Sequence, residues 1–257
     1  MRPARVGGEG WTGVIGGHAG SERTWGVQRW RDLLFLHWVI APDQLRPLVA
    51  DPLALDLHAG RAYVGIVAFR MEGVRPGWLP ARFGFAFPET NVRTYVRGPD
   101  GTPGVYFFSL DAGSWLAVAA ARAGFGLPYY AARMRVDATP SRVAYCSERF
   151  APGRPGLRAE AALGPARGPA LPGTLEEFLV ERYLLYVRRR GALWRGHVYH
   201  APYPLREAAL GPWDETLLRS AGLPRPPGPP LVHFATGVDV VVGRPCPCPP
   251  AEEVDPG

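Results

Sequence analysis

The chain has 257 residues, of which 47% are hydrophobic and 20% are charged. This composition is typical of a globular protein with an apolar core and excludes a disordered chain, collagen or a coiled coil as the main state. All 29 basic residues are arginine, and the formal net charge is +6. Reactions that need a lysine amine are therefore excluded. The three cysteines offer no disulfide framework, so we expect a reducing, cytoplasmic location.

The arginines are spread along the chain instead of forming a basic patch. The longest run, 188–190, stands before Gly191, where a hairpin turn is expected. Scattered cations favour a solvated surface over a phosphate-binding face, so no nucleic-acid partner is expected. No apolar segment reaches the roughly 18 residues of a membrane helix, and the N-terminus lacks an apolar secretion segment. We therefore expect no membrane partner.

Three regions follow from the pattern along the chain. Residues 1–24 are expected to be a disordered Gly-rich leader, 25–243 a single domain, and 244–257 a disordered tail rich in proline and acidic residues. Turn residues and hydrophobic periodicity predict the following elements in chain order. The first part of the chain has a strand at Leu33–Ile40, a helix at Pro42–Val49, strands at Leu53–His58, Arg61–Met71, Asn91–Arg97 and Val105–Asp111, and a helix at Ser114–Ala123. The second part has strands at Arg133–Asp137, Arg142–Glu148 and Leu157–Leu163, a helix after the capping box of Thr174 and Glu177, strands at Tyr183–Arg189 and Leu193–His200, a helix at Trp213–Ala221 capped by Asp214, and a strand at Leu231–Val242.

Many short strands and few helices predict a mainly β fold of the α+β class. We expect a single antiparallel β-barrel or sandwich with a few short helices attached. A break into two domains at 152–172, where Gly and Pro gather, stays open. The alternation within Leu157–Leu163 favours one domain.

The most informative segment is 87–96. Its period of two places Glu89, Asn91, Arg93 and Tyr95 on one face. If that face meets water, the segment is an ordinary amphipathic strand. If it points into a barrel, the buried acid and guanidinium must pair or bind a polar ligand, which would make the cavity a site with Glu89 as acid or base and the others as ligand-binding groups.

The next strand adds two polar residues. The same period places Ser109 and Asp111 on one face with Val105 and Phe107. Asp111 is expected to cap the helix that follows, and Ser109 to reach the ligand. Arg122, at the end of that helix, either complements the helix C-terminus or anchors an anion.

Histidines suggest no metal site. His37 and His233 lie within apolar strands, where they are hydrogen-bonded core residues or line the same cavity. His197 and His200 are three residues apart, so on a strand they point to opposite faces and cannot chelate together. The sequence also lacks a phosphate loop, a dinucleotide fingerprint and a nucleophile elbow. We expect neither a metal nor another cofactor.

Seven phrases in order resemble the YqjF-like family of uncharacterised bacterial proteins, within the acetoacetate-decarboxylase-like superfamily. They are Trp30–Trp38, Phe87–Val96, Gly104–Asp111, Leu127–Tyr129, Phe178–Tyr183, His200–Leu205 and Gly237–Val240. The resemblance covers about 25–242. It implies an antiparallel β-barrel or cone with a central polar cavity, and so favours an inward-facing polar strand.

The chain departs from the superfamily in its chemistry. Acetoacetate decarboxylase forms an imine with a lysine amine whose pKa is lowered, and this chain has no lysine. Three functions stay open. They are binding of a small carboxylate or keto acid without catalysis, a lyase or hydrolase-like enzyme with Glu89 as acid or base and Arg93 as anchor, and a structural or partner-binding role in which a Glu89–Arg93 pair fixes strand register. The ligand and the oligomeric state, a homodimer included, stay open.

Overall fold

The structure is a computed structural model that describes residues 24–124, 126–189, 191–224 and 226–248. The expected leader lies outside the described residues except for Thr24, which begins the first strand. At the other end, Cys246 and Pro247 form a short strand at the start of the expected tail, opposite Arg195 and Trp194. The rest of that tail, from 249 onward, lies outside the described residues.

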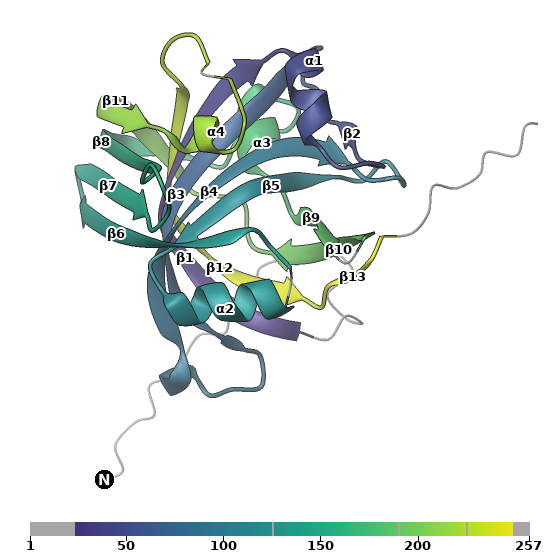
Figure 1. Cartoon of the computed structure of the whole chain (residues 1–257). Helices are drawn as coiled ribbons and strands as arrows, with labels where there is room; N and C mark the ends of the chain where they lie inside the picture. Colours follow the sequence, from purple (N-terminus) through teal and green to yellow (C-terminus); the bar gives the residue numbers. More distant parts are fainter. Residues whose placement is uncertain (1–23, 125, 190, 225, 249–257) are drawn as a thin grey trace, which may run out of the picture.

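The described chain forms one sheet with short helices around it (Figure 1), which confirms the mainly β prediction. Its strands are β1 (Thr24–Ile40), β2 (Ala54–Leu55), β3 (Ala62–Pro76), β4 (Phe85–Arg97), β5 (Pro103–Ala112), β6 (Tyr129–Thr139), β7 (Arg142–Arg149), β8 (Gly156–Gly168), β9 (Leu184–Arg189), β10 (Ala192–Tyr199), β11 (Leu205–Glu215), β12 (Leu231–Gly243) and β13 (Cys246–Pro247). Its α-helices are α1 (Pro42–Leu45), α2 (Trp115–Gly124), α3 (Leu175–Val180) and α4 (Leu217–Ser220), with 3-10 turns at Arg46–Leu48 and Ala81–Phe83.

The sheet is mixed, so the prediction of purely antiparallel strands is wrong. The strand order is β13-β10-β9-β5-β6-β7-β8-β11-β12-β1-β3-β4-β2, with further pairings of β5 with β4 and of β10 with β12. The strands from β5 to β4 in this order therefore form a closed circuit. β5 runs parallel to both β6 and β9. Parallel neighbours need a crossover connection, and α2 supplies it between β5 and β6.

The predicted helix at 213–221 is wrong in its first half. Trp213 and Asp214 belong to β11 and pair with β8, so Asp214 caps no helix. The helix α4 begins only at Leu217, and the carboxylate of Glu215 accepts a hydrogen bond from the Leu218 N–H at 2.9 Å. The sheet takes the residues that propensity assigns to a helix because they complete an antiparallel pair with β8.

A β-bulge in β1 decides which residues face inward. Arg31 lies opposite Arg70 of β3, but Leu34 lies opposite Ala68, so β1 carries one extra residue here. Asp32 takes a left-handed conformation with φ of 54° at this point. After the bulge, odd-numbered residues of β1 take the face of the sheet that even-numbered residues occupy before it.

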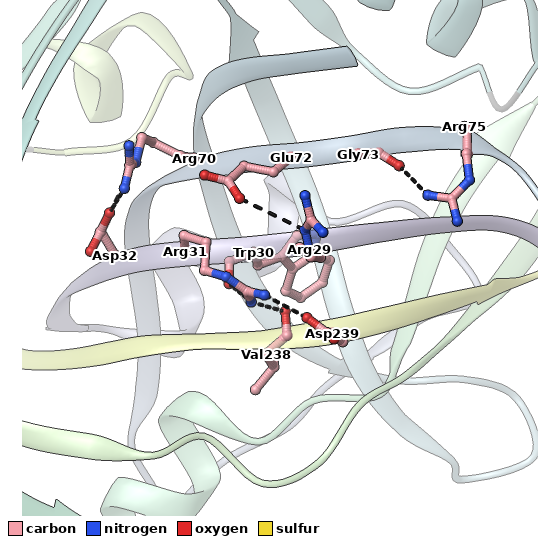
Figure 2. Close-up of polar contacts among 10 residues, drawn as sticks. All are labelled: Arg29, Trp30, Arg31, Asp32, Arg70, Glu72, Gly73, Arg75, Val238 and Asp239. Atoms are coloured by element: carbon pink, nitrogen blue, oxygen red, sulfur yellow. Dashed lines mark hydrogen bonds and ion pairs between the residues drawn. The ribbon is translucent and has the colours of Figure 1, made fainter. Parts of the chain in front are cut away.

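Charged side chains secure this bulge on the outer face of the sheet. Figure 2 shows Arg70 of β3 reaching Asp32, with Nε donating to Oδ2 at 2.9 Å, and Arg31 reaching Asp239 of β12, with Nη2 donating to Oδ1 at 2.6 Å. A third contact in Figure 2 joins Arg29 to Glu72 at 3.8 Å. These ion pairs link β1 to its two neighbours, β3 and β12, close to the bulge.

Two apolar cores lie on the two faces of the sheet. The first includes Leu33, Phe35, Val67, Phe69, Phe87, Tyr95 and Leu110. The second includes Leu34, Leu36, Leu45, Ile66, Val92, Leu217, Leu218 and Phe234, so that α1 and α4 belong to it. Figure 1 places α1 and α4 at the upper end of the molecule and α2 at the lower end. Both faces of β1 are thus buried after its bulge, which explains its continuous apolar sequence.

Candidate functional site

A cavity of about 670 Å³ lies within the first core. Its polar lining residues are Gln28, Arg75, Glu89, Asn91, Arg93, Tyr129, Arg182, Tyr203 and Arg244, together with Thr24. Glu89, Asn91 and Arg93 are only 2%, 4% and 8% exposed. The polar face of β4 therefore points into the cavity and does not meet bulk water, as an ordinary amphipathic strand would.

Glu89 is the acid of this cavity. Tyr129 donates its hydroxyl hydrogen to Oε2 at 2.6 Å, and the Asn91 amide approaches Oε1 at 3.5 Å. Burial raises the pKa of Glu89 to about 7, and the negative charge of Asp111 adds to this, while the hydrogen bonds from Tyr129 and Asn91 oppose it. Near neutral pH both protonation states of Glu89 are populated, so this carboxyl can donate or accept a proton.

Arg93 places a cation in the same cavity without a carboxylate partner among the described residues. Its Nη2 donates to the Leu179 carbonyl at 3.1 Å, and its guanidinium lies 5.6 Å from the ring centre of Phe35 and 5.8 Å from that of Tyr95. Its buried Nε has no hydrogen-bond partner there. Glu181 lies close enough for its charge to interact with Arg93, but the two form no ion pair. An anionic ligand in contact with the guanidinium would offset the cost of burying it.

The expected Glu89–Arg93 pair does not form among the contacts of the described residues. Residues four apart on a strand stand about 13 Å apart along the chain direction. Glu89 is held by Tyr129 and Asn91 instead, and Arg93 by the backbone of α3. An internal ion pair that fixes the register of β4 is therefore not part of this structure.

Arg182 is a second cavity cation, and sequence reasoning missed it. Its Nη2 donates to Asp56 Oδ2 at 3.1 Å, while Arg97 donates to the other oxygen of Asp56 at 2.8 Å. Its guanidinium lies 4.3 Å from the ring centre of Phe178 and 5.2 Å from that of Tyr95. Burial lowers the pKa of Arg182. Arg182 belongs to the segment 178–183, which carries part of the family resemblance. Nothing else in the sequence indicated that it lines the cavity.

Tyr95 and His37 form a layer behind Arg93. The Tyr95 hydroxyl donates to the Leu179 carbonyl at 2.6 Å, so it accepts from His37 Nε2, which lies 2.8 Å away. His37 is fully buried, and burial lowers its pKa well below the usual range, with His233 and Arg93 adding to this effect. His37 is thus neutral with its proton on Nε2. It acts as a hydrogen-bonded core histidine.

His233 continues this layer away from the cavity. Its ring centre lies 5.8 Å from that of His37, and its Nε2 lies 3.7 Å from Glu176 Oε1. Burial lowers the pKa of His233. Of the described residues, Tyr95, His37 and His233 stand next to the wall of the cavity and are not among those that line it.

A β-bulge in β5 places Ser109 away from the cavity. Val92 lies opposite Ser109, whereas Arg93 lies opposite Phe107, so Phe108 is an extra residue in β5. The expectation that Ser109 shares a face with Phe107 is therefore wrong. The buried Ser109 Oγ has no hydrogen-bond partner in the described part of the chain.

Asp111 lies beyond the same bulge and also faces the second core. It binds Arg149, whose Nε donates to Oδ1 at 2.9 Å. Burial raises the pKa of Asp111 to about 6, although Arg149 opposes the shift. Asp111 does not cap α2, as the sequence suggested. Ser114 does, because its Oγ accepts from the Ala117 N–H at 3.3 Å.

Arg122 lies outside the cavity. Its side chain is exposed near the end of α2. Nε donates to the Tyr129 carbonyl at 2.7 Å, and the guanidinium lies 5.7 Å from the ring centre of Tyr130. Arg122 therefore attaches α2 to the start of β6.

The sequence profile of the DUF2071 family, described as an uncharacterized conserved protein, matches residues 27–239. The chain belongs to this family. The protein YqjF of Bacillus subtilis (strain 168), also described as uncharacterized, is 37% identical to it over 217 residues, which are 83% of this chain and 88% of YqjF. The YqjF-like resemblance of the seven phrases is confirmed.

Solved structures extend the likeness of this DUF2071 protein at the level of fold. The enduracididine biosynthesis enzyme MppR complexed with pyruvate superposes with a TM-score of 0.62 at 12% identity, over 90% of this chain and 92% of MppR. Acetoacetate decarboxylase from Legionella pneumophila gives a TM-score of 0.61 at 16% identity, over 88% of this chain and 90% of the enzyme. The DUF2071 chain thus shares the acetoacetate-decarboxylase-like fold.

Neither a metal-binding cluster nor a membrane-spanning helix is found among the described residues. Among them, no three His, Cys, Asp or Glu side chains gather in a way that could hold a metal ion. Within the same part of the chain, the helices are too short or too polar to span a membrane.

Proposed function

We propose that this DUF2071 protein binds a small molecule with a carboxylate group, and that the carboxylate lies at Arg93 inside the cavity. The observation that carries the proposal is the buried guanidinium of Arg93, which forms no ion pair with a carboxylate among the described residues. Arg182 adds a second cation to the cavity lining. A guanidinium has several N–H groups with which to bind a carboxylate, and Arg93 gives one of them, on Nη2, to the Leu179 carbonyl.

The shared fold supports this choice of ligand. MppR, which has the same fold, is described as complexed with pyruvate, a keto acid. Fold alone does not carry function, so the proposal rests on the guanidinium of Arg93 and not on the shared fold. We also propose that the closed circuit of strands from β5 to β4 is a cone-like barrel around the cavity. One sheet that runs from Thr24 to Pro247 supports a single domain.

An enzyme that acts on the same kind of ligand is the second proposal. Glu89 lines the cavity with a pKa raised to about 7 by burial, and Tyr129 holds it at 2.6 Å. A carboxyl of this kind can move a proton to or from a bound acid near neutral pH. A Schiff-base decarboxylase is excluded because the chain has no lysine.

Calorimetric titration with pyruvate and with acetoacetate tests the binding proposal. We expect Arg93→Gln to weaken binding about 10- to 100-fold, since a hydrogen bond to a charged group contributes about 1.5–3 kcal/mol. Arg122→Gln, which removes an exposed arginine, is the matched control and should bind like the wild type. Equal affinity of Arg93→Gln and the wild type would refute the proposed anchor.

Proton NMR of the same mixtures over hours tests the enzyme proposal. We expect a bound keto acid in D2O to exchange the C–H hydrogen next to its ketone for deuterium faster with the wild type than with Glu89→Gln or in buffer alone, because Glu89 would remove this hydrogen as a proton. If the keto acid binds to both proteins but does not react in either, the enzyme proposal is refuted and only the binding proposal stands.

A further inference from the structure

The cavity is much larger than a three-carbon acid, and most of its wall is apolar. At about 670 Å³ it lies within the range of roughly 300–1,000 Å³ that holds drug-sized ligands. Its apolar wall comes from several strands and from α2, and includes Leu33, Phe35, Val67, Phe69, Phe87, Phe107, Leu110, Ala117 and Leu127. A small keto acid held at Arg93 would not reach most of these side chains.

The lining residues of β4 show how the wall changes along the cavity. Phe85, Phe87, Glu89, Asn91 and Arg93 all line it in this order. On the described pairing with β3 and β5, the extra residue of each bulge lies on the neighbouring strand, so the alternation of β4 is unbroken. The eight residue steps from Phe85 to Arg93 span about 26 Å. The wall thus begins with two aromatic side chains, continues past the carboxyl of Glu89 and the amide of Asn91, and ends at the cation of Arg93. Phe85 is 41% exposed, whereas Arg93 is buried.

Aromatic residues also surround the open end of the cavity. Trp25 and Trp78 line it and are 45% and 81% exposed. Arg75 lines the same region, but its guanidinium is bonded to the backbone, with Nε donating to the Leu79 carbonyl and Nη1 to the Gly73 carbonyl, each at 3.0 Å. Exposed aromatic side chains at the rim of a deep apolar cavity suit the entry of an apolar chain.

We infer that the ligand is a monocarboxylic acid with a long apolar tail, which lies along β4 from Arg93 toward Phe85. This inference rests on the proposed function, because Arg93 supplies the carboxylate anchor in both. It goes further in naming the class of acid. An acyl or aryl tail, which the apolar wall would remove from water, makes up most of the ligand.

A chain-length series tests the inference. The probes are acetate, hexanoate, octanoate and decanoate, titrated calorimetrically against the full chain. Each added methylene that becomes buried should tighten binding about four-fold. Arg93→Gln should weaken octanoate and acetate by a similar factor, since it removes only the anchor. Methyl octanoate, which has the tail without the charge, should bind the wild type more weakly than octanoate.

A pair of variants in α2 tests where the tail lies. Ala117 lines the cavity and is buried, whereas Ala119 of the same helix is exposed. Ala117→Leu fills part of the cavity and should weaken octanoate more than acetate, while Ala119→Leu should bind both like the wild type. Circular dichroism and thermal melting establish that each variant is folded. Equal octanoate affinity in folded Ala117→Leu and Ala119→Leu would overturn the inference.

The outcomes separate this inference from the proposed function. If acetate or pyruvate binds through Arg93 but affinity does not rise with chain length, the long-tail inference fails and the proposed function stands. If no acid binds, both fail. Arg244 also lines the cavity, so the dicarboxylate suberate completes the series. Tighter binding of suberate than of octanoate would overturn the assignment of a monocarboxylate.

Discussion

Replacement of the buried Glu89 by glutamine should change how the stability of the protein depends on pH. Burial raises the pKa of this carboxyl from 4.5 to about 7 in the folded protein. In the unfolded chain the carboxyl ionises at its ordinary pKa. Between these two values the folded state binds the proton that the unfolded state has lost, so the free energy of unfolding falls as the pH rises.

The size of this effect follows from the two pKa values. One pKa unit corresponds to about 1.4 kcal/mol, so a rise from 4.5 to about 7 costs the wild type on the order of 3 kcal/mol of unfolding free energy. The loss begins above pH 4.5 and is complete above about pH 7. Glutamine cannot ionise and escapes the loss. Its carbonyl can still accept the hydrogen bond that Tyr129 now gives to Glu89.

Urea unfolding followed by tryptophan fluorescence, from about pH 4 to pH 8, measures the difference. The unfolding free energy of Glu89→Gln minus that of the wild type should grow by on the order of 3 kcal/mol from below pH 4.5 to above pH 7. Asp111 also has a raised pKa, but it is present in both proteins and cancels in the difference. Glu207→Gln, at an exposed position of β11, controls for the loss of one negative charge. Parallel curves for Glu89→Gln and the wild type would refute the reasoning.

Three further changes test neighbouring features. Tyr129→Phe removes a hydrogen bond that lowers the pKa of Glu89, so in a Tyr129→Phe background the same difference curve should have its midpoint at higher pH. Arg149→Met leaves the Asp111 carboxylate buried without its partner and should lower the unfolding free energy at pH 8 by about 3–5 kcal/mol. Arg149 lowers the pKa of Asp111, so in the variant this carboxyl takes up a proton at higher pH than in the wild type and the loss should shrink as the pH falls. An equal loss at pH 5 would contradict this account. Gly237→Ala should lower the melting temperature and cost about 1–3 kcal/mol, because φ is 146° there and a Cβ would clash with the carbonyl oxygen of Trp30. An unchanged melting temperature would show that the backbone adapts.

Sequence periodicity predicted the part of the site that lies on one regular strand. Glu89, Asn91 and Arg93 line the cavity together because no bulge interrupts the alternation of β4. The same rule failed on β5, where one extra residue turned Ser109 and Asp111 to the other face. A bulge of this kind leaves no clear mark in a short apolar segment such as Val-Tyr-Phe-Phe-Ser.

Other parts of the site depend on the whole fold. Tyr129 reaches Glu89 from 40 residues away in sequence, and Arg182 reaches the cavity from the segment after α3. No local period relates such residues to β4. The antiparallel prediction failed for a similar reason, since the parallel partners of β5 are set by a crossover through α2 and by the distant strand β9. Pairing between segments that are remote in sequence thus determines the strand directions and the positions of Tyr129 and Arg182.

An extra residue in a regular strand acts much as a frameshift acts on a gene, and the bulge at Asp32 absorbs the extra residue of β1. If Asp32 were accommodated as a regular strand residue, the strict alternation of β1 would move Leu33, Phe35 and His37 to the face of the second core and bring Leu34 and its alternate neighbours into the cavity. The sequence after that point would be unchanged, but its inside and outside would be exchanged. A relative that lacks the extra residue and has a regular strand here would keep the same side chains on each face, so relatives that differ in length must be aligned on the bulge.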